Sequence, residues 1–375
     1  MNRREFLKYF SLVGASVAIG RTSAYAKWLT NKKRNGFPQG MLLIDTHAHP
    51  DQFYYMGPTE GPQWETWCNQ FCDESSTLEK IMKLGMQNSS FAAIGDTSNI
   101  NNPIPFSEVM AQIDRVIDLE RQGLLRIVRR HEDMVHGGPP KGFIPGAILS
   151  LEGASPLGLD ENTVFKNLDI LYECGVRMIT LMHYLDNQFG QAMRKDRAKT
   201  YGNGLEVLGE KVVNRMMELG IVIDVAHAHY PTLRDIAKIA TTNGIPLIDS
   251  HTSLSPCTEF CGGRLRTWEE MEMVAETGGV ICTWPLKWEG SNGSSRLTIH
   301  DWAKENLEIA REIGIEHVGL GTDGGGVLPL MVDDYSSILD LPKLVEAMDE
   351  VGLKRSEIEA YMGGNLFRVI KQCIG

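Results

Sequence analysis

Histidine and acidic side chains stand in this sequence where a metal ion could be bound. His47-Ala48-His49 directly follows an apolar run, and side chains two residues apart on an extended chain share one face. Paired imidazoles of this kind are common metal ligands, although a single pair is weak evidence by itself. The stronger indication is that further groups of the same chemistry also follow apolar runs. They are Glu152, His183, His227, His251 and Asp323.

Imidazole and carboxylate ligands suit Zn²⁺ or another divalent first-row ion, and no cysteine belongs to the set. The number of ligands predicts two metal ions, with Glu152 bridging them and a hydroxide between them. Two such ions would lower the pKa of the bound water and polarise a carbonyl group. Asp323, which is not needed as a ligand, would take the proton from the water and pass it on.

Eight short apolar runs alternate with segments of helical periodicity, which predicts an α/β fold. Near-continuous apolar runs of this length are typical of strands buried on both faces of a parallel sheet. Eight βα units in order predict a (β/α)₈ TIM-like barrel, in which active sites lie at the carboxyl ends of the strands. The predicted strands are 41–44, 91–94, 147–151, 176–181, 221–226, 246–250, 280–284 and 318–322.

We predict a single metallo-hydrolase domain over residues 27–375, with two insertions. The first, at about 53–90, carries Trp64, Trp67, Cys68 and Cys72 and is expected over the barrel mouth. The second, at about 285–300, is rich in glycine and serine and is expected to be a loop.

Residues 1–26 have the features of a twin-arginine signal peptide. Arg3-Arg4-Glu5-Phe6-Leu7-Lys8 precedes a short apolar stretch, and Ala24-Tyr25-Ala26 offers small residues for cleavage. The segment predicts use of the twin-arginine export machinery and a periplasmic or otherwise exported protein. It would be a membrane anchor if it were not cleaved. Basic residues opening an ordinary helix are the alternative interpretation.

Charge and cysteine content limit the classes of function. The formal net charge is −11; the first 26 residues contribute +3, so the remainder carries −14. Such an acidic surface repels phosphates and disfavours a nucleic-acid partner.

The 7 cysteines include two pairs spaced by four residues, Cys68 with Cys72 and Cys257 with Cys261. Free, partly buried thiols are the expectation, and a disulfide in either pair is the alternative.

Seven ordered motifs resemble the membrane dipeptidase (renal dipeptidase) family, peptidase family M19 of the amidohydrolase superfamily. The similarity runs from about Leu42 to Ile374, nearly the whole predicted mature chain. The motifs are IDTHAHPD, SLEGASPLG, GVRMITLMHYLDN, GLEVLGEKVVNRMMELGIVIDVAHAH, PLIDSHTSL, HVGLGTDGGG and GGNLFRVI.

The resemblance implies a metal-dependent dipeptidase and a role for each matched residue. His47 and the residue at 49 would bind the first metal ion, and Glu152 would bridge. Asp323 would be the catalytic acid and base. The remaining implied roles are a second metal ion on His227 and His251, an oxyanion donor at His183, and a grip on the substrate carboxylate by Arg264. A homodimer is also implied.

Two departures from the family pattern concern the first metal ion and the substrate. The family usually has aspartate where this chain has His49, so a neutral imidazole replaces an anion. Around Arg264 the local pattern differs, which makes Arg266 a rival for the carboxylate. The loop with Trp284 and Trp288 lacks a clear counterpart of the family's substrate-contacting tyrosine.

Four functions are therefore compared. The first is an exported hydrolase of dipeptides, and the second uses the same two metal ions on a lactam, a lactone or an N-acyl amino acid. The third is a catalytically silent binding protein, which the complete set of ligand residues disfavours. The fourth is a metal-dependent nuclease of the TatD type, suggested by the DTHAH motif and disfavoured by the acidic charge.

Overall fold

The computed structural model describes most of the chain after the predicted signal peptide. The described residues are 37 and 40–375, apart from 59, 97–103, 137–142, 195–196, 257–263, 290–294 and 329. The predicted signal peptide, residues 1–26, and the pair Cys257 and Cys261 lie outside the described residues.

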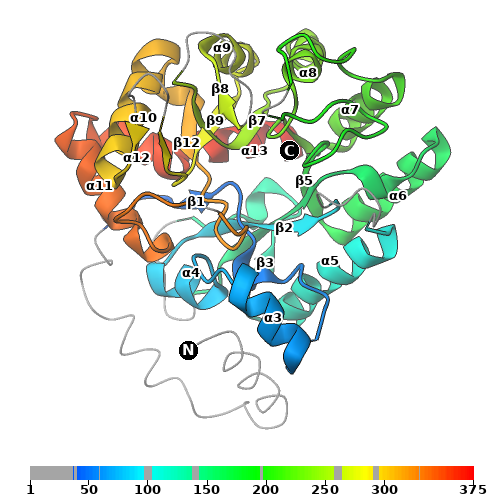
Figure 1. The fold of residues 1–375 in the computed structure, drawn as a ribbon, viewed down its shortest axis with the longest axis horizontal. Coiled ribbons are helices and arrows are strands. Elements are labelled where there is room, and N and C mark those ends of the chain that lie inside the picture. The colour runs from blue at the N-terminus through cyan, green and yellow to red at the C-terminus, as the bar shows by residue number, and fades with distance from the viewer. Residues whose placement is uncertain are drawn as a thin grey trace.

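Eight parallel strands stand side by side in chain order and form a nearly closed barrel (Figure 1). Between the first and last strands, the Thr46 amide donates a hydrogen bond of 3.0 Å to the Leu320 carbonyl, and Ala48 bridges to Gly324. The predicted α/β barrel is confirmed. The strands are β1 (Ile44–Asp45), β2 (Asn88–Ile94), β4 (Gly146–Glu152), β5 (Val176–Thr180), β6 (Val222–Asp224), β7 (Ile248–Leu254), β9 (Val280–Thr283) and β12 (Val318–Leu320). Short strands β3 (Arg126–Ile127) and β8 (Leu265–Arg266) pair with β4 and β7.

Amphipathic helices surround the strands as an outer layer (Figure 1). In α7, Val212, Val213 and Met216 recur at helical spacing and are all buried, while the opposite face is polar. The helix ends at Gly220, whose φ of 73° is readily adopted only without a side chain. The layer comprises α5 (Phe106–Arg121), α6 (Glu161–Cys174), α7 (Val207–Leu219), α8 (Tyr230–Asn243), α9 (Trp268–Glu276), α10 (Ile299–Ile313) and α11 (Leu341–Glu350).

The C-terminal helix closes the end of the barrel opposite the predicted site. Helix α13 (Asn365–Ile374), which follows α12 (Arg355–Glu359), contributes Leu366, Val369 and Ile370 to an apolar cluster. Residues near the strand starts, among them Val222 and Val280, complete that cluster. Since this end is filled by side chains, the opposite end is left for chemistry. Among the described residues, no helix is both long and apolar enough to cross a membrane.

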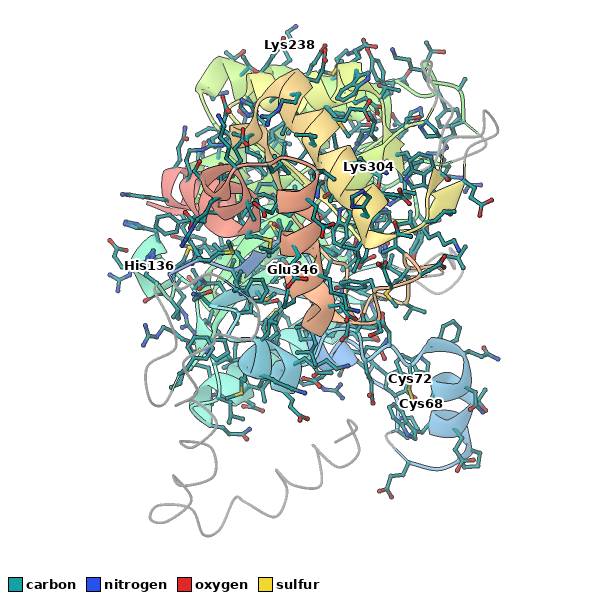
Figure 2. All side chains as sticks on the ribbon, turned by 90° about the vertical axis from the view of Figure 1, so that its left-hand side faces the viewer. Cys68, Cys72, His136, Lys238, Lys304 and Glu346 are labelled. Carbon is teal, nitrogen blue, oxygen red and sulfur yellow. A yellow bond between two sulfur atoms is a disulfide. The ribbon has the colours of Figure 1, made fainter. Side chains whose placement is uncertain are left out.

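The segment after β1 forms two helices before β2 begins. These are α3 (Pro62–Phe71) and α4 (Leu78–Leu84). Cys68 and Cys72 form a disulfide at the end of α3, so the expectation of free thiols is wrong for this pair. One helical turn brings the two side chains onto one face, which allows the bond. Figure 2 shows α3 standing out from the body of the molecule.

The described residues of the segment 285–300 include regular secondary structure. They contain an antiparallel pair, β10 (Trp288–Glu289) with β11 (Ser295–Arg296), and the first residues of α10. The buried Arg296 anchors it by an ion pair of 2.9 Å with Glu305 and a hydrogen bond of 2.9 Å to the Leu286 carbonyl. Glycine and serine content gave no sign of this buried anchor.

Candidate metal centre

Five histidine side chains converge on the carboxylate of Glu152 at the carboxyl ends of the strands. Glu152 is the last residue of β4, and its side chain is buried. The sequence placed these residues at the ends of five predicted strands, with His47 and His49 after the same strand, and the barrel brings all of them together. The distances from each Nε2 to the nearer Glu152 oxygen are 3.4 Å for His47, 3.4 Å for His49, 3.6 Å for His183, 2.9 Å for His227 and 3.5 Å for His251.

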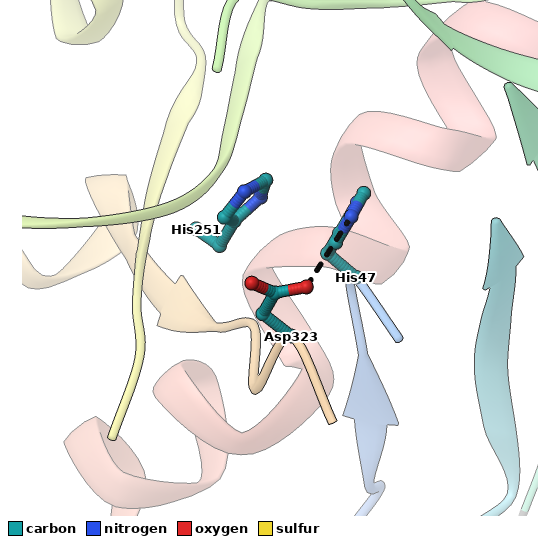
Figure 3. A group of neighbouring side chains, drawn as sticks. All are labelled: His47, His251 and Asp323. Carbon is teal, nitrogen blue, oxygen red and sulfur yellow. Dashed lines mark ion pairs between the residues drawn. The ribbon is translucent and has the colours of Figure 1, made fainter. Parts of the chain in front are cut away.

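Asp323 follows β12 and lies beside the two histidines that follow β1. Its Oδ1 is 3.9 Å from Nε2 of His47 and 3.5 Å from Nε2 of His49. Figure 3 shows Asp323 and His251 on neighbouring segments facing His47. The side chains form three sets of possible metal ligands. Within each set the ligand atoms lie within 4.8 Å of one another, which is close enough to share an ion. The sets are His47 with His251 and Asp323, His47 with His49 and Glu152, and Glu152 with His183 and His227.

Two residues of the centre have a left-handed backbone. The φ angle is 64° at His227 and 50° at Asp323. This conformation is uncommon for residues with a side chain and costs of order 1 kcal/mol or more. Such strain persists where the surrounding structure fixes it, as at functional sites.

The charge states of Glu152, His227 and His251 suit metal binding. Burial alone would raise the pKa of Glu152, but the imidazoles of His183 and His47 hold it well below its usual range. Burial lowers the pKa of His227 and His251 well below 6.5, which favours neutral imidazole. Anionic carboxylate and neutral imidazole are the forms that ligate divalent ions.

A polar network behind the histidines fixes their orientation. Ser250 Oγ lies 2.9 Å from Nδ1 of His251 and 3.4 Å from Nδ1 of His47, and it donates to Asp224 at 2.6 Å. Nδ1 of His49 lies 2.7 Å from the Ala92 carbonyl oxygen. An acceptor behind Nδ1 leaves Nε2 free to bind, as is usual for metal-bound histidine. Sequence reasoning missed Ser250 and Asp224, because they fall inside predicted strands rather than after them.

His183 differs from the other four histidines by having an acidic partner of its own. Its Nδ1 is 3.1 Å from Asp96 Oδ1, on the segment after β2. Burial opposes the charged form, but Glu152 and Asp96 together raise the pKa of His183. Asp96 was also missed, although its place directly after a predicted strand was a usable signal.

The two rival arginines lie in different environments. Arg266 is buried and bound by Asp249 at 2.7 Å and Glu270 at 3.0 Å. Arg264 faces the cavity described below, with its guanidinium carbon 5.2 Å from the Trp284 ring centroid. Its Nη2 donates to the His251 carbonyl at 3.0 Å. Of the two, Arg264 alone lines the space in which a substrate would lie.

A cavity of about 860 Å³ opens above the centre. Its floor contains Glu152, His49, His227, His251 and Asp323. Further out, aromatic and aliphatic side chains line it. This combination of a polar floor and apolar sides is typical of small-molecule sites.

The residues of the centre fit a divalent metal ion. Nε2 of His47 is buried and has no hydrogen-bond partner among the described residues, although polar atoms in protein interiors are normally satisfied. Nε2 atoms of His227 and His251 face one another at 3.1 Å. Two neutral imidazoles can supply only acceptors on those nitrogens when Nδ1 carries the proton, and a cation between them resolves the conflict.

The known proteins that this chain resembles include dipeptidases. Residues 64–374 match the profile of Membrane dipeptidase (Peptidase family M19). An uncharacterized dipeptidase, C965.12 of Schizosaccharomyces pombe, is 32% identical over 204 residues, which cover 54% of this chain and 47% of that protein. Mouse dipeptidase 3 is 28% identical over 230 residues, covering 60% of this chain and 44% of that protein. The chain thus matches about half the length of these relatives.

Solved structures show the same fold. The dipeptidase AC, a metallopeptidase of family M19, superposes with a TM-score of 0.71 at 17% identity, covering 90% of this chain and 100% of that one. A metallopeptidase from Rhodobacter sphaeroides, solved with a phosphinate mimic of the dipeptide L-Ala-D-Ala, gives 0.70 at 16% identity, with coverage of 89% and 99%.

Proposed function

Because the chain belongs to the membrane dipeptidase family, peptidase family M19, we propose that it hydrolyses the amide bond of dipeptides in a metal-dependent reaction. The observation that carries the proposal is the convergence of five imidazoles on Glu152, with Asp323 beside them. The dipeptide mimic bound by the Rhodobacter metallopeptidase supports the choice of substrate.

We propose two divalent ions, with Zn²⁺ as the native metal. His47, His49 and Glu152 would hold the first, and Glu152, His227 and His251 the second. The three overlapping ligand sets support more than one ion, and the imidazole-rich composition supports zinc. The ions would supply an activated water and polarise the scissile carbonyl.

Asp323 is proposed as the group that moves the proton. Its carboxylate lies at the edge of the centre, 3.5 Å from Nε2 of His49, and lines the cavity. It would accept the proton of the attacking water and deliver it to the leaving amine. His183 would donate a hydrogen bond to the oxyanion, and its raised pKa supports the protonated form.

Arg264 is proposed to hold the carboxylate of the substrate's C-terminal residue. A guanidinium binds a carboxylate through two parallel hydrogen bonds. Arg264 lies in the cavity wall and, among the described residues, donates one hydrogen bond, to the His251 carbonyl. Arg266 does not line the cavity and has four hydrogen bonds within the protein.

We further propose that the protein is exported. The Arg3-Arg4 motif ahead of a short apolar stretch supports the twin-arginine route, and the Cys68–Cys72 disulfide supports an oxidising compartment. Mass spectrometry of the exported protein tests cleavage after Ala26, and an intact Met1 would indicate a retained anchor. A homodimer is the family expectation, which light scattering of the purified protein tests.

The function is tested with a panel of L-L and L-D dipeptides. Zinc-loaded protein should release free amino acids, and Asp323→Asn should keep its metal while losing most turnover. Glu152→Gln serves as the metal-deficient control. If metal-loaded wild type cleaves none of the panel, dipeptides are excluded and lactams, lactones and N-acyl amino acids become the next substrates to examine. Full activity in Asp323→Asn would remove its proposed role.

A further inference from the structure

The outer half of the cavity has an apolar wall that the hydrolytic chemistry does not require. We define the apolar wall as Trp67, Phe71, Leu328 and Leu330, all of which line the cavity. Trp67 and Phe71 come from α3, and the two leucines come from the segment after Asp323. A cavity of about 860 Å³ lies towards the upper end of small-molecule sites, which span about 300–1,000 Å³. Two small residues bound at the floor would leave this wall uncovered.

Exposed apolar side chains are concentrated at this cavity. Among the described residues, seven large hydrophobic side chains are exposed, and three of them line the cavity. These are Phe71 at 45%, Tyr184 at 49% and Leu330 at 60% exposure. Grouped exposure of this kind marks a surface that binds a ligand or partner, whereas isolated exposed residues need no explanation.

The aromatic part of the wall is held in place before any ligand arrives. The Trp67 ring packs on Tyr55 with centroids 4.1 Å apart and stacks on Trp64 at 5.6 Å. The disulfide between Cys68 and Cys72 ties the end of the same helix. A wall that is already ordered loses little conformational entropy when a side chain packs against it.

Hydrogen bonds also join the two parts of the wall. Gln52 Nε2 donates to the Phe71 carbonyl at 2.8 Å and to the Gly325 carbonyl at 3.1 Å. Asp73 accepts from the amides of Gly325 and Val327, each at 3.1 Å. The end of α3 and the segment after Asp323 therefore form one unit beside the metal centre.

The position of this unit indicates which part of a substrate would reach it. Arg264 directly precedes β8, which pairs with β7, and His183 follows β5, whereas the apolar wall adjoins the ends of β1 and β12. Tyr54, between the wall and the centre, has its ring centroid 5.3 Å from that of His49. With the substrate's carboxylate at Arg264 and its scissile carbonyl at the centre, the amino-terminal residue points to the wall.

We propose that the apolar wall is a subsite for a large aromatic or branched aliphatic side chain on the amino-terminal residue of the substrate. The preferred substrates are then dipeptides such as Phe-Ala or Leu-Ala rather than Ala-Ala. This inference rests on the proposed function and on the proposed orientation of the substrate by Arg264.

The test compares kcat/KM for Phe-Ala and Ala-Ala in wild type and in wall variants. Phe71→Ala and Leu330→Ala are suitable because both side chains are already exposed, and Trp67→Ala removes the largest side chain of the wall. Wild type should favour Phe-Ala at least tenfold, and each wall variant should reduce that ratio several-fold, the scale expected for apolar contacts in a pocket. Leu159→Ala is the matched control, since Leu159 is 83% exposed and does not line the cavity.

A binding measurement separates the subsite from turnover. Calorimetry with two phosphinate isosteres, of Phe-Ala and of Ala-Ala, should show tighter binding of the first, with the difference reduced in Trp67→Ala. Circular dichroism and metal content establish that each variant is folded and loaded.

The outcomes distinguish the two proposals. Cleavage of Ala-Ala with no preference for Phe-Ala, or a preference that all three wall variants retain, overturns the subsite and leaves the dipeptidase intact. No cleavage of any dipeptide by metal-loaded protein overturns both. Burial of Phe71 and Leu330 in a dimer, seen as protection from hydrogen exchange and labelling, would assign the wall to a second copy and overturn the subsite.

Discussion

Replacing Arg266 by methionine is expected to destabilise the fold severely, whereas the same change at Arg264 is expected to impair substrate binding alone. Arg266 is 1% exposed, and its guanidinium pairs with Asp249 at 2.7 Å and Glu270 at 3.0 Å. It also donates to the carbonyls of Val225 at 2.7 Å and Ala228 at 2.8 Å.

Methionine would occupy much of the space but would leave buried acceptors without donors. Removing one partner of a buried ion pair costs about 3–5 kcal/mol. Since two carboxylates and two carbonyls lose the same partner, we expect the upper part of that range, about 5 kcal/mol. The free energy of unfolding of a typical protein is about 5–15 kcal/mol, so this loss is a large part of it. The variant should therefore unfold at a much lower denaturant concentration than wild type.

The assay is guanidinium chloride unfolding followed by circular dichroism in a chelating buffer, which removes the contribution of bound metal. Arg264→Met is the matched control and should unfold within about 1 kcal/mol of wild type. Its kcat/KM for a dipeptide should fall about 10- to 150-fold, the equivalent of a charged hydrogen bond of about 1.5–3 kcal/mol. The corresponding dipeptide amide, which lacks the carboxylate, should be affected far less.

Wild-type stability in Arg266→Met would refute the reasoning, because the four bonds to Arg266 would then contribute nothing that methionine cannot replace. A large loss of stability in Arg264→Met would equally refute it, since Arg264 would then be part of the framework. Unchanged kinetics in Arg264→Met would remove its role in binding.

Three further predictions concern the metal centre and the disulfide. Glu152→Gln should retain the fold but bind much less metal, as measured by inductively coupled plasma mass spectrometry. The amide cannot supply an anionic oxygen to each of the two proposed ions. Full metal occupancy would show that Glu152 is dispensable as a ligand. Ser250→Ala should weaken metal affinity about 10- to 100-fold in chelator competition, since Nδ1 of His251 loses its partner at 2.9 Å, and an unchanged affinity would contradict this. Cys68 and Cys72 should react with iodoacetamide in denaturant only after reduction, and labelling without reductant in peptide mapping would exclude the bond.

Much of the centre was predictable because strand order fixes which residues meet. A parallel barrel places every strand's carboxyl end on one face, so residues that follow apolar runs, such as Glu152 and Asp323, must converge. The sequence does not show which of two similar residues is buried and structural in the folded protein. Arg264 and Arg266 are two residues apart with the same chemistry, and only the positions of Asp249 and Glu270 make one of them structural.

The features that sequence reasoning missed have two physical causes. Ser250 and Asp224 are polar residues inside a buried strand pattern, and their role depends on a contact of 2.6 Å between neighbouring strands. The pair β10 and β11 is only two residues long on each side, too short for a periodic signal. The buried Arg296 of β11 pairs with Glu305 in α10.

The seam between the first and last strands makes the geometry of the metal centre depend on the last strand of the barrel. The Asp323 amide donates to the His47 carbonyl at 2.8 Å, and the Thr322 amide donates to Asp45 at 2.8 Å. A chain still being synthesised, with all five histidines made but β12 absent, lacks the contacts that fix His47 and His49. We therefore expect the ligand geometry only once the two ends of the barrel have met, so a tightly held ion would indicate a chain made at least as far as Asp323.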